Sequence, residues 1–290
     1  MKYHKFPPRR ILVPSDMSAA SSVALAFARV LQDRFEASVH VLHAQHFDLP
    51  PYFSSGQMDN LTHELKKSKK AATDYLRREA ATALGRTPEV SIVDRPPAEA
   101  ILEATTRLEA DLLIMGTHGR RGAERIWLGS VAERILRESP SPVLAVRQTA
   151  RPGLFRSILC PVNFTDVAQE ALDYALEIAA AIQAPLTVLH ALEEGKPART
   201  LPLIKDQLRQ HCDVEEVVVQ GSAAKTILEA ARNRKPDLIV IGAERKVSHF
   251  GGFFSSTTER VMQWAEAPLL VVPKEPLQQP GSDAGVPRKP

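Results

Sequence analysis

The stretch "GTHGRRGAERIWLGS" (116–130) contains the residue types and spacing best suited to bind an anion. It holds four glycines and ends on Ser130, and it lies between the apolar run "DLLIMG" and the amphipathic run "VAERILRE". Glycine lets a ligand approach the backbone closely, and the free N–H groups at the start of a helix attract anions. The stretch therefore suits a polyphosphate. A glycine-rich turn without a ligand remains open from this spacing alone.

Other nucleotide and catalytic motifs are absent from the sequence. No G-x-x-x-x-G-K-[ST] occurs, which gives no support to a Walker-type kinase or ATPase. No G-x-G-x-x-G follows the first apolar strand, so a dinucleotide-binding fold is not supported either. No motif pairs a general base with a nucleophile, and we therefore expect no catalytic residues.

The sequence is duplicated. The segment from Arg10 aligns without a gap with the segment from Ser157, at an offset of 147, and "VLHA" occurs at the same place in both. After residue 100 the offset is 126, because the first copy has a longer middle. We expect a first domain over 1–149 and a second over 150–274. The remaining tail, 275–290, is rich in Pro, Gly and polar residues and is expected to be disordered.

Each copy shows the same alternation of short apolar strands and amphipathic helices. In the first helix of copy one a single face carries the apolar side chains of Val23, Phe27, Val30 and Leu31. Ser18 and Thr165 suit the N-cap of this helix in the two copies. Such alternation indicates an α/β fold, with a doubly wound parallel sheet of about five strands in each domain. Ligands of such sheets bind at the carboxyl ends of the strands.

The glycine spacing and its flanks resemble a known family. Gly116, two residues, Gly119, nine residues, Gly129 and Ser130 match the G-2x-G-9x-G-[ST] signature of the universal stress protein family. The phrases "ILVPSDMS", "LGSVAERIL" and "SPVLAV" are also similar, and the resemblance covers nearly the whole chain in two copies. It implies a Rossmann-like fold of the adenine nucleotide alpha hydrolase type. It also implies that the last strands, "PVLAVR" and "PLLVVP", pair to form a pseudo-dimer within one chain.

The resemblance implies a binding site in copy one. Asp16 and Ala44 would border an adenine, while Met115 and Gly116 would line the adenine and the ribose. Gly119, Gly129 and Ser130 would hold the phosphates of ATP. The expected set is completed by Pro14, Val131 and His118, the last adding a hydrogen bond from within the loop. Arg95 departs from the family, which has a small residue there; it could pair with a phosphate or crowd the pocket.

Copy two departs from the signature. Arg245 and Ser255 stand where copy one has Gly119 and Gly129, and Asn163 replaces Asp16. A side chain in a left-handed conformation costs about 1–2 kcal/mol. We therefore expect copy two not to bind ATP in the family manner. The alternative is that Arg245 contacts a phosphate and that the following "GG" rebuilds the loop.

Composition excludes several classes of function. The net charge of +3 over 290 residues is too small to indicate nucleic acid, and no apolar run approaches the ~18 residues of a membrane span. Two cysteines, Cys160 and Cys212, fit a reducing cytoplasm. The basic run "KKSKK" (66–70) is expected to be a solvated helix face, with an anionic partner as the alternative. His43 recurs as His190, which favours a structural role over metal binding.

The resemblance implies an ATP-binding regulator of the stress response, in which the nucleotide in copy one biases a conformation or a partner surface. A nucleotide-independent interaction module is the alternative. We expect at most slow ATP hydrolysis or autophosphorylation, and a true enzyme lacks sequence support. A bound triphosphate usually carries Mg²⁺. We further expect a cytoplasmic homodimer with protein partners that the sequence does not name.

Overall fold

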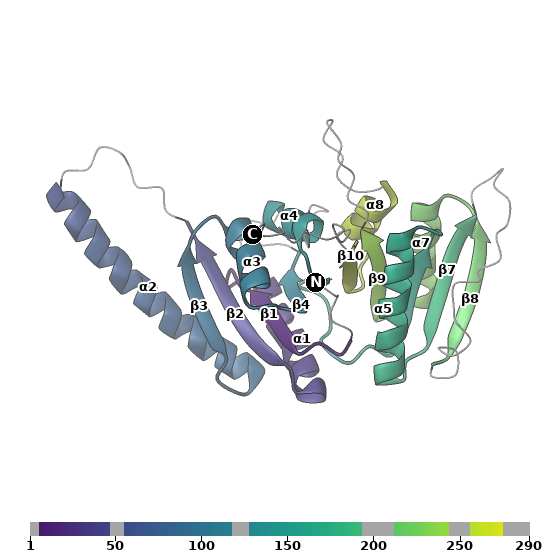
Figure 1. Cartoon of the computed structure of the whole chain (residues 1–290), viewed down its shortest axis with the longest axis horizontal. Helices are drawn as coiled ribbons and strands as arrows, with labels where there is room; N and C mark the ends of the chain where they lie inside the picture. Colours follow the sequence, from purple (N-terminus) through teal and green to yellow (C-terminus); the bar gives the residue numbers. More distant parts are fainter. Residues whose placement is uncertain (1–5, 47–54, 118–127, 193–211, 244–255, 275–290) are drawn as a thin grey trace, which may run out of the picture.

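The computed structural model describes residues 6–46, 55–117, 128–192, 212–243 and 256–274. All ten strands of these ranges join one sheet, in the order β3-β2-β1-β4-β5-β10-β9-β6-β7-β8. Figure 1 shows the two copies on either side of the centre of this sheet, with β3 and β8 at its far ends. The α/β fold with two tandem units is therefore confirmed.

The described part of copy one contains five strands and four helices. The strands are β1 (Arg10–Pro14), β2 (Ser38–Gln45), β3 (Glu89–Asp94), β4 (Leu112–Gly116) and β5 (Val143–Val146). The helices are α1 (Ala19–Phe35), α2 (Ser55–Leu84), α3 (Pro97–Arg107) and α4 (Ser130–Glu138). The long helix α2 extends past the end of β3 in Figure 1, and it occupies the longer middle of this copy.

Copy two repeats this order from β6 onward. Its strands are β6 (Ile158–Val162), β7 (Leu186–Leu192), β8 (Val214–Gln220), β9 (Leu238–Ala243) and β10 (Leu269–Pro273). Its described helices are α5 (Asp166–Ile182), α7 (Ala223–Arg234) and α8 (Ser256–Trp264). Two layers of buried apolar side chains, one on each face, fill the space between the common sheet and these helices.

The two copies meet through their last strands. β5 and β10 run antiparallel, whereas the other neighbouring strands of the sheet run parallel. Leu144 lies opposite Leu270, and these leucines are equivalent positions of the two copies at the offset of 126. A local two-fold axis therefore passes between them. The expected pseudo-dimer within one chain is confirmed, and the pairing removes two edges that would otherwise be open to other strands.

Reciprocal aromatic contacts reinforce this junction. Phe6, at the start of copy one, packs edge-on against Tyr174 of α5, with ring centroids 6.1 Å apart. Phe155, at the start of copy two, stacks on Phe27 of α1, also at 6.1 Å. Tyr174 and Phe27 are equivalent positions, so each copy inserts one aromatic ring against the first helix of the other. Such aromatic pairs stabilise by about 0.5–1.5 kcal/mol beyond the area they bury.

Local details of the helices follow the sequence. The Ser18 side chain caps α1 by accepting from the N–H of Ser21, and the Thr165 side chain caps α5 by accepting from the N–H of Ala168. Helix α3 ends at Arg107, shortly before Glu109, which takes a left-handed conformation with φ 47°. In the described ranges, no helix combines the length and apolar character needed to cross a membrane.

Candidate functional site

The strand order brings the expected ligand-binding residues to one place. β1 lies between β2 and β4, so the chain moves to one side of β1 and then returns to the other. This is the topological switch point, where ligands of doubly wound sheets bind at the carboxyl ends of strands. The described members of the set all lie at these strand ends or at the start of α4: Pro14, Asp16, Ala44, Met115, Gly116, Gly129, Ser130 and Val131. His118 and Gly119 lie outside the described residues.

The turn after β1 is held by a carboxylate. Oδ1 of Asp16 accepts the N–H of Ser18 at 3.1 Å and the hydroxyl of Ser21 at 2.6 Å. Ser21 is buried in the first turn of α1, whereas Asp16 is half-buried. The next residue, Met17, takes φ 62°. The turn therefore places a carboxylate just beyond the end of β1 and fixes its direction through α1.

The repeated histidine holds the same turn in both copies. Nδ1 of His43 lies 2.7 Å from the carbonyl oxygen of Ser15, and Nδ1 of His190 lies 3.0 Å from that of Val162. Since a carbonyl only accepts, Nδ1 carries the hydrogen in each case. Ser15 and Val162 are equivalent positions, so the predicted structural role of this histidine at the strand end agrees with its hydrogen bond.

Gly116 is required by packing. A Cβ at this position would lie 2.6 Å from Cβ of Ala20, on α1. Gly242, its equivalent in copy two, is blocked in the same way: a Cβ there would lie 2.4 Å from the carbonyl oxygen of Val167 on α5. The first helix of each copy thus crosses the end of the fourth strand too closely for any side chain. This glycine is explained without a ligand.

Gly129 differs from Gly116 in this respect. It is the N-cap of α4, with φ −63° and ψ 145°, values that any residue can adopt. A Cβ there would meet a single atom, the carbonyl oxygen of Thr117, at an ordinary 3.4 Å. Neither backbone conformation nor packing among the described residues therefore calls for glycine. The following N–H groups of Ser130 and Val131 begin the helix and have no partner within it.

Thr117 connects the start of α4 to the sheet. Its carbonyl oxygen accepts the N–H of Gly129 at 2.9 Å, and its own N–H donates to the carbonyl of Val146 at 3.0 Å. The next residue, Arg147, is half-buried and donates from Nη2 to the carbonyl oxygen of Gln263 at 2.6 Å. Burial lowers the pKa of Arg147, and the nearby charge of Glu266 partly opposes this shift. Thr117 and Gly129, at the described ends of the glycine loop, are thus linked through the end of β5 to helix α8 of copy two.

Arg95 has a partner on the protein. Its Nη1 donates to the carboxylate of Glu103, on α3, and its side chain is 58% exposed. Its equivalent in copy two, Gly221, takes φ 145°, a conformation unfavourable for a side chain. Copy one therefore follows a different path after its third strand and directs this guanidinium to α3.

Copy two carries matched changes in the turn after its first strand. Asn163 replaces Asp16, and Ala168 replaces Ser21, so the carboxylate and its hydroxyl donor are lost together. Asn163 instead accepts the hydroxyl of Thr165 at 2.7 Å. The backbone is retained, because Phe164 takes φ 58° where Met17 takes 62°. The two remaining changes, Arg245 and Ser255, lie outside the described residues.

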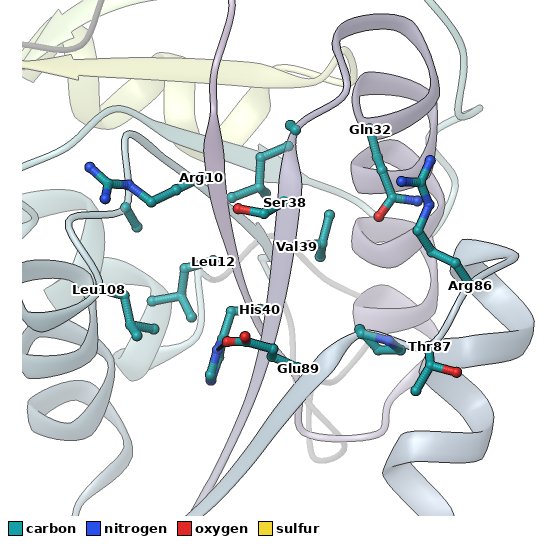
Figure 2. Close-up of a pocket in the computed structure, with 14 residues that line it drawn as sticks. Arg10, Leu12, Gln32, Ser38, Val39, His40, Arg86, Thr87, Glu89 and Leu108 are labelled. Atoms are coloured by element: carbon teal, nitrogen blue, oxygen red, sulfur yellow. Dashed lines mark hydrogen bonds and ion pairs between the residues drawn. The ribbon is translucent and has the colours of Figure 1, made fainter.

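A separate cavity of about 320 Å³ opens at the opposite, amino ends of β1 to β3. Figure 2 shows Arg10, His40 and Arg86 around it. Each of these side chains already has a carboxylate partner: Glu109 at 2.8 Å, Glu89 at 3.2 Å and Asp33 at 3.4 Å, respectively. The cavity lies away from the switch point and these three side chains already have partners, so we do not assign it to a ligand. No cluster of potential metal ligands occurs within the described ranges either.

Sequence reasoning missed three residues that shape the site. Ser21 orients Asp16, Ala20 forces glycine at 116, and Thr117 links the loop to β5. The internal repeat contained a signal for Ser21, because copy two replaces both this serine and its partner Asp16. No sequence pattern indicated Ala20 or Thr117, because their roles arise from contacts between elements that are distant in the sequence.

Comparison with known proteins agrees with this geometry. The profile of the Universal stress protein family matches residues 8–147, 154–211 and 201–273. A universal stress protein of Methanocaldococcus jannaschii is 31% identical over 143 residues, covering 48% of this chain and 82% of that protein. One from Mycolicibacterium smegmatis is 23% identical over 291 residues, covering 90% of this chain and 96% of its own length.

Solved structures show the same fold. A universal stress protein from Archaeoglobus fulgidus superposes with a TM-score of 0.74 at 23% identity, covering 92% of this chain and 99% of the other. The duplicated sequence, the ten-stranded sheet and the repeated family match lead to one conclusion. The chain belongs to the universal stress protein family, as a tandem member with two copies of the domain.

Proposed function

We propose that copy one binds an adenine nucleotide, ATP, at the switch point between β1 and β4, and that copy two does not. The main support is Gly129: this glycine stands at the start of α4, although neither its backbone conformation nor packing among the described residues requires it. Its lack of a side chain leaves room for a group that approaches the backbone, and helix starts attract phosphates. Asp16, Ala44 and Met115 lie at or just beyond the carboxyl ends of β1, β2 and β4.

The matched losses in copy two support a single site per chain. The aspartate, its serine partner and two signature glycines are all replaced there. The glycine that packing demands, Gly242, is retained. Copy two has therefore kept the glycine that packing demands and lost four polar or glycine positions that suit a ligand in copy one. Residues 1–149 would form the nucleotide-binding domain and 150–274 the second domain.

In this proposal the protein is a stress-response regulator of the cytoplasm, and any hydrolysis of ATP is slow. Mg²⁺ would accompany the triphosphate. A homodimer would have to use a surface other than β5 and β10, because these strands already pair with each other within the chain. The alternative function is an interaction module that works without nucleotide. The contact of Arg147 with α8 offers a path by which either function could reach copy two.

Isothermal titration of the full chain with ATP and Mg²⁺ tests the proposal. One ATP bound per chain, with binding abolished by Gly129→Ala, is the expected result. Two ATP per chain would show that copy two has a rebuilt site. No binding to a correctly folded chain would leave the nucleotide-independent module as the better explanation.

A further inference from the structure

A wide groove lies beside copy two, away from the residues assigned to the nucleotide. It is bounded by the linker between the copies (149–156) and by the C-terminal ends of α7 and α8. Its cavity volume is about 1140 Å³. Pockets for small molecules usually measure about 300–1,000 Å³. The groove is thus large enough for a longer ligand.

Two large apolar side chains of the groove are exposed. Trp264, at the end of α8, is 46% accessible, and Leu154, in the linker, is 39% accessible. Both line the groove. Exposed apolar side chains that gather in one hollow mark interaction sites more often than scattered ones do. Tryptophan in particular is enriched among the residues that carry binding energy at protein interfaces.

The same groove presents positive charge. Arg151, Arg232 and Lys235 line it and are exposed, and no ion pair joins them to another residue of the described ranges. Asp237 and Glu266 also line it. Asp237 is engaged by Arg156 at 3.6 Å, and the charge of Glu266 acts on Arg147. The three cations are therefore available to an external anion.

The equivalent surface of copy one shows that the fold does not require these residues. There Thr106, Glu109 and Glu138 occupy the positions of Arg232, Lys235 and Trp264. Glu109 pairs with Arg10 at 2.8 Å, and Glu138 pairs with Arg137 at 2.7 Å. Glu109 and Lys235 even share the same left-handed backbone, with φ 47° and 49°. One copy thus builds this corner from internally paired acidic groups, and the other leaves it basic and aromatic.

We propose that this groove docks an extended acidic peptide segment of a partner protein. A large apolar side chain of the peptide would pack against Trp264 and Leu154, and its carboxylates would meet Arg151, Arg232 and Lys235. A peptide also fits the two carboxylates of the groove, since its backbone N–H groups can donate to them. A single tryptophan does not provide the series of stacking platforms that single-stranded nucleic acid uses, which favours a peptide.

The groove lies near Thr117 and Leu128, at the described ends of the glycine loop of copy one. β5 and β10 run antiparallel. The carboxyl ends of the strands of copy one therefore lie at the same edge of the common sheet as the amino ends of the strands of copy two. Ala265 and Ala267 line the groove and also a narrow gap that reaches Thr117 and Leu128. Docking itself needs no nucleotide, however, and its test is carried out without ATP, so it can fail independently of the proposed function.

The test selects a random twelve-residue peptide display library on the full chain. The counter-selection uses a variant with Arg232→Thr and Lys235→Glu, which gives copy two the residues of copy one. A matched control carries Lys67→Glu and Lys70→Thr on the exposed face of α2, for the same change in net charge. Selected peptides are then titrated against chains with Trp127→Phe, in which Trp264 is the only tryptophan.

The expected outcome is enrichment of acidic peptides with a large apolar residue. They should change the emission of Trp264 in a saturable way, bind the counter-selection variant at least tenfold more weakly and bind the α2 control unchanged. Selection of basic peptides, or of peptides whose binding does not depend on charge, would overturn the proposal. Equal binding to the counter-selection variant and to the α2 control would overturn it too. Tighter binding of an oligo-dT strand than of any selected peptide, or concentration-dependent pairing of the chain through this groove, would overturn it as well.

Discussion

Leu144 of β5 and Leu270 of β10 lie opposite each other, and they are the same position of the duplicated domain. Both are buried, with 1% and 3% of their surface exposed. The pair marks the local two-fold axis of the chain. It makes the stability of each copy depend on the other, because the central strands of the common sheet come from different copies.

We predict that Leu144→Ala destabilises both copies together. Truncation of a buried leucine costs about 2–5 kcal/mol, and here the cavity lies on the shared axis. Urea unfolding is followed by tryptophan fluorescence in two variants that each keep one tryptophan. The variant that keeps Trp127 reports on copy one, and the variant that keeps Trp264 reports on copy two. The two midpoints should fall by the same amount. A fall in the copy one signal alone would show that the copies unfold independently.

The two glycines of the site should respond differently to alanine. Gly116→Ala forces a contact with Ala20 and should cost about 1–3 kcal/mol of stability, as overpacking does. Gly129→Ala meets no close atom and should cost only about 0.5–1 kcal/mol, from a poorer N-cap. Urea unfolding measures the stability, and calorimetric titration measures ATP binding.

Only Gly129→Ala should therefore remove ATP binding from a chain that is still close to native stability. A Gly129→Ala protein that binds ATP with unchanged affinity would mean that the space above this residue is not used by the phosphates. Gly153→Ala is a suitable control, because a Cβ there would meet nothing within 4 Å.

Replacement of Asp16 by asparagine should weaken the turn after β1. Hydrogen bonds to a charged group contribute about 1.5–3 kcal/mol, against about 1 kcal/mol for neutral pairs. Asp16→Asn keeps the acceptor for Ser18 and Ser21 but removes the charge, and we expect a loss of roughly 1 kcal/mol and weaker nucleotide binding. Chemical denaturation and calorimetric titration measure the two effects. The reciprocal Asn163→Asp should leave ATP binding unchanged, because Ala168 cannot donate to the new carboxylate.

Alkaline pH should destabilise the protein through two buried groups. Burial raises the pKa of the Cys160 thiol above its ordinary 9.0 and that of the Tyr174 phenol above its ordinary 10.0. The folded state thus holds both protons more tightly than the unfolded state. Their contribution is fully present below about pH 9 and decreases as the pH rises further, by up to about 1.4 kcal/mol per pH unit for each group.

The variant Cys160→Val isolates one of these groups, since valine is the residue of copy one at this position. Its unfolding free energy should fall less steeply than that of the unmodified chain between pH 9 and pH 10.5. Identical slopes in urea unfolding over this range would show that the thiol does not titrate with unfolding.

The sequence by itself determined the duplication, the alternation of strands and helices and the family signature. These features are local or periodic: a face of α1, an N-cap at Ser18, a glycine spacing, a phrase that recurs at a fixed offset. The pairing of β5 with β10 could be expected because two equivalent edge strands need partners. The expected site residues were named from the resemblance to the family, and the strand-end rule for parallel sheets predicted where they would gather.

Only the tertiary structure decided why individual residues are present. Gly116 and Gly129 look alike in the sequence, yet the close crossing of α1 demands only the first. Glu109 and Lys235 share one backbone conformation, but only the arrangement of linker, α7 and α8 turns Lys235 into part of a groove. The physical reason is that close packing and charge pairing depend on distances between segments far apart in the chain, which residue type and spacing do not contain.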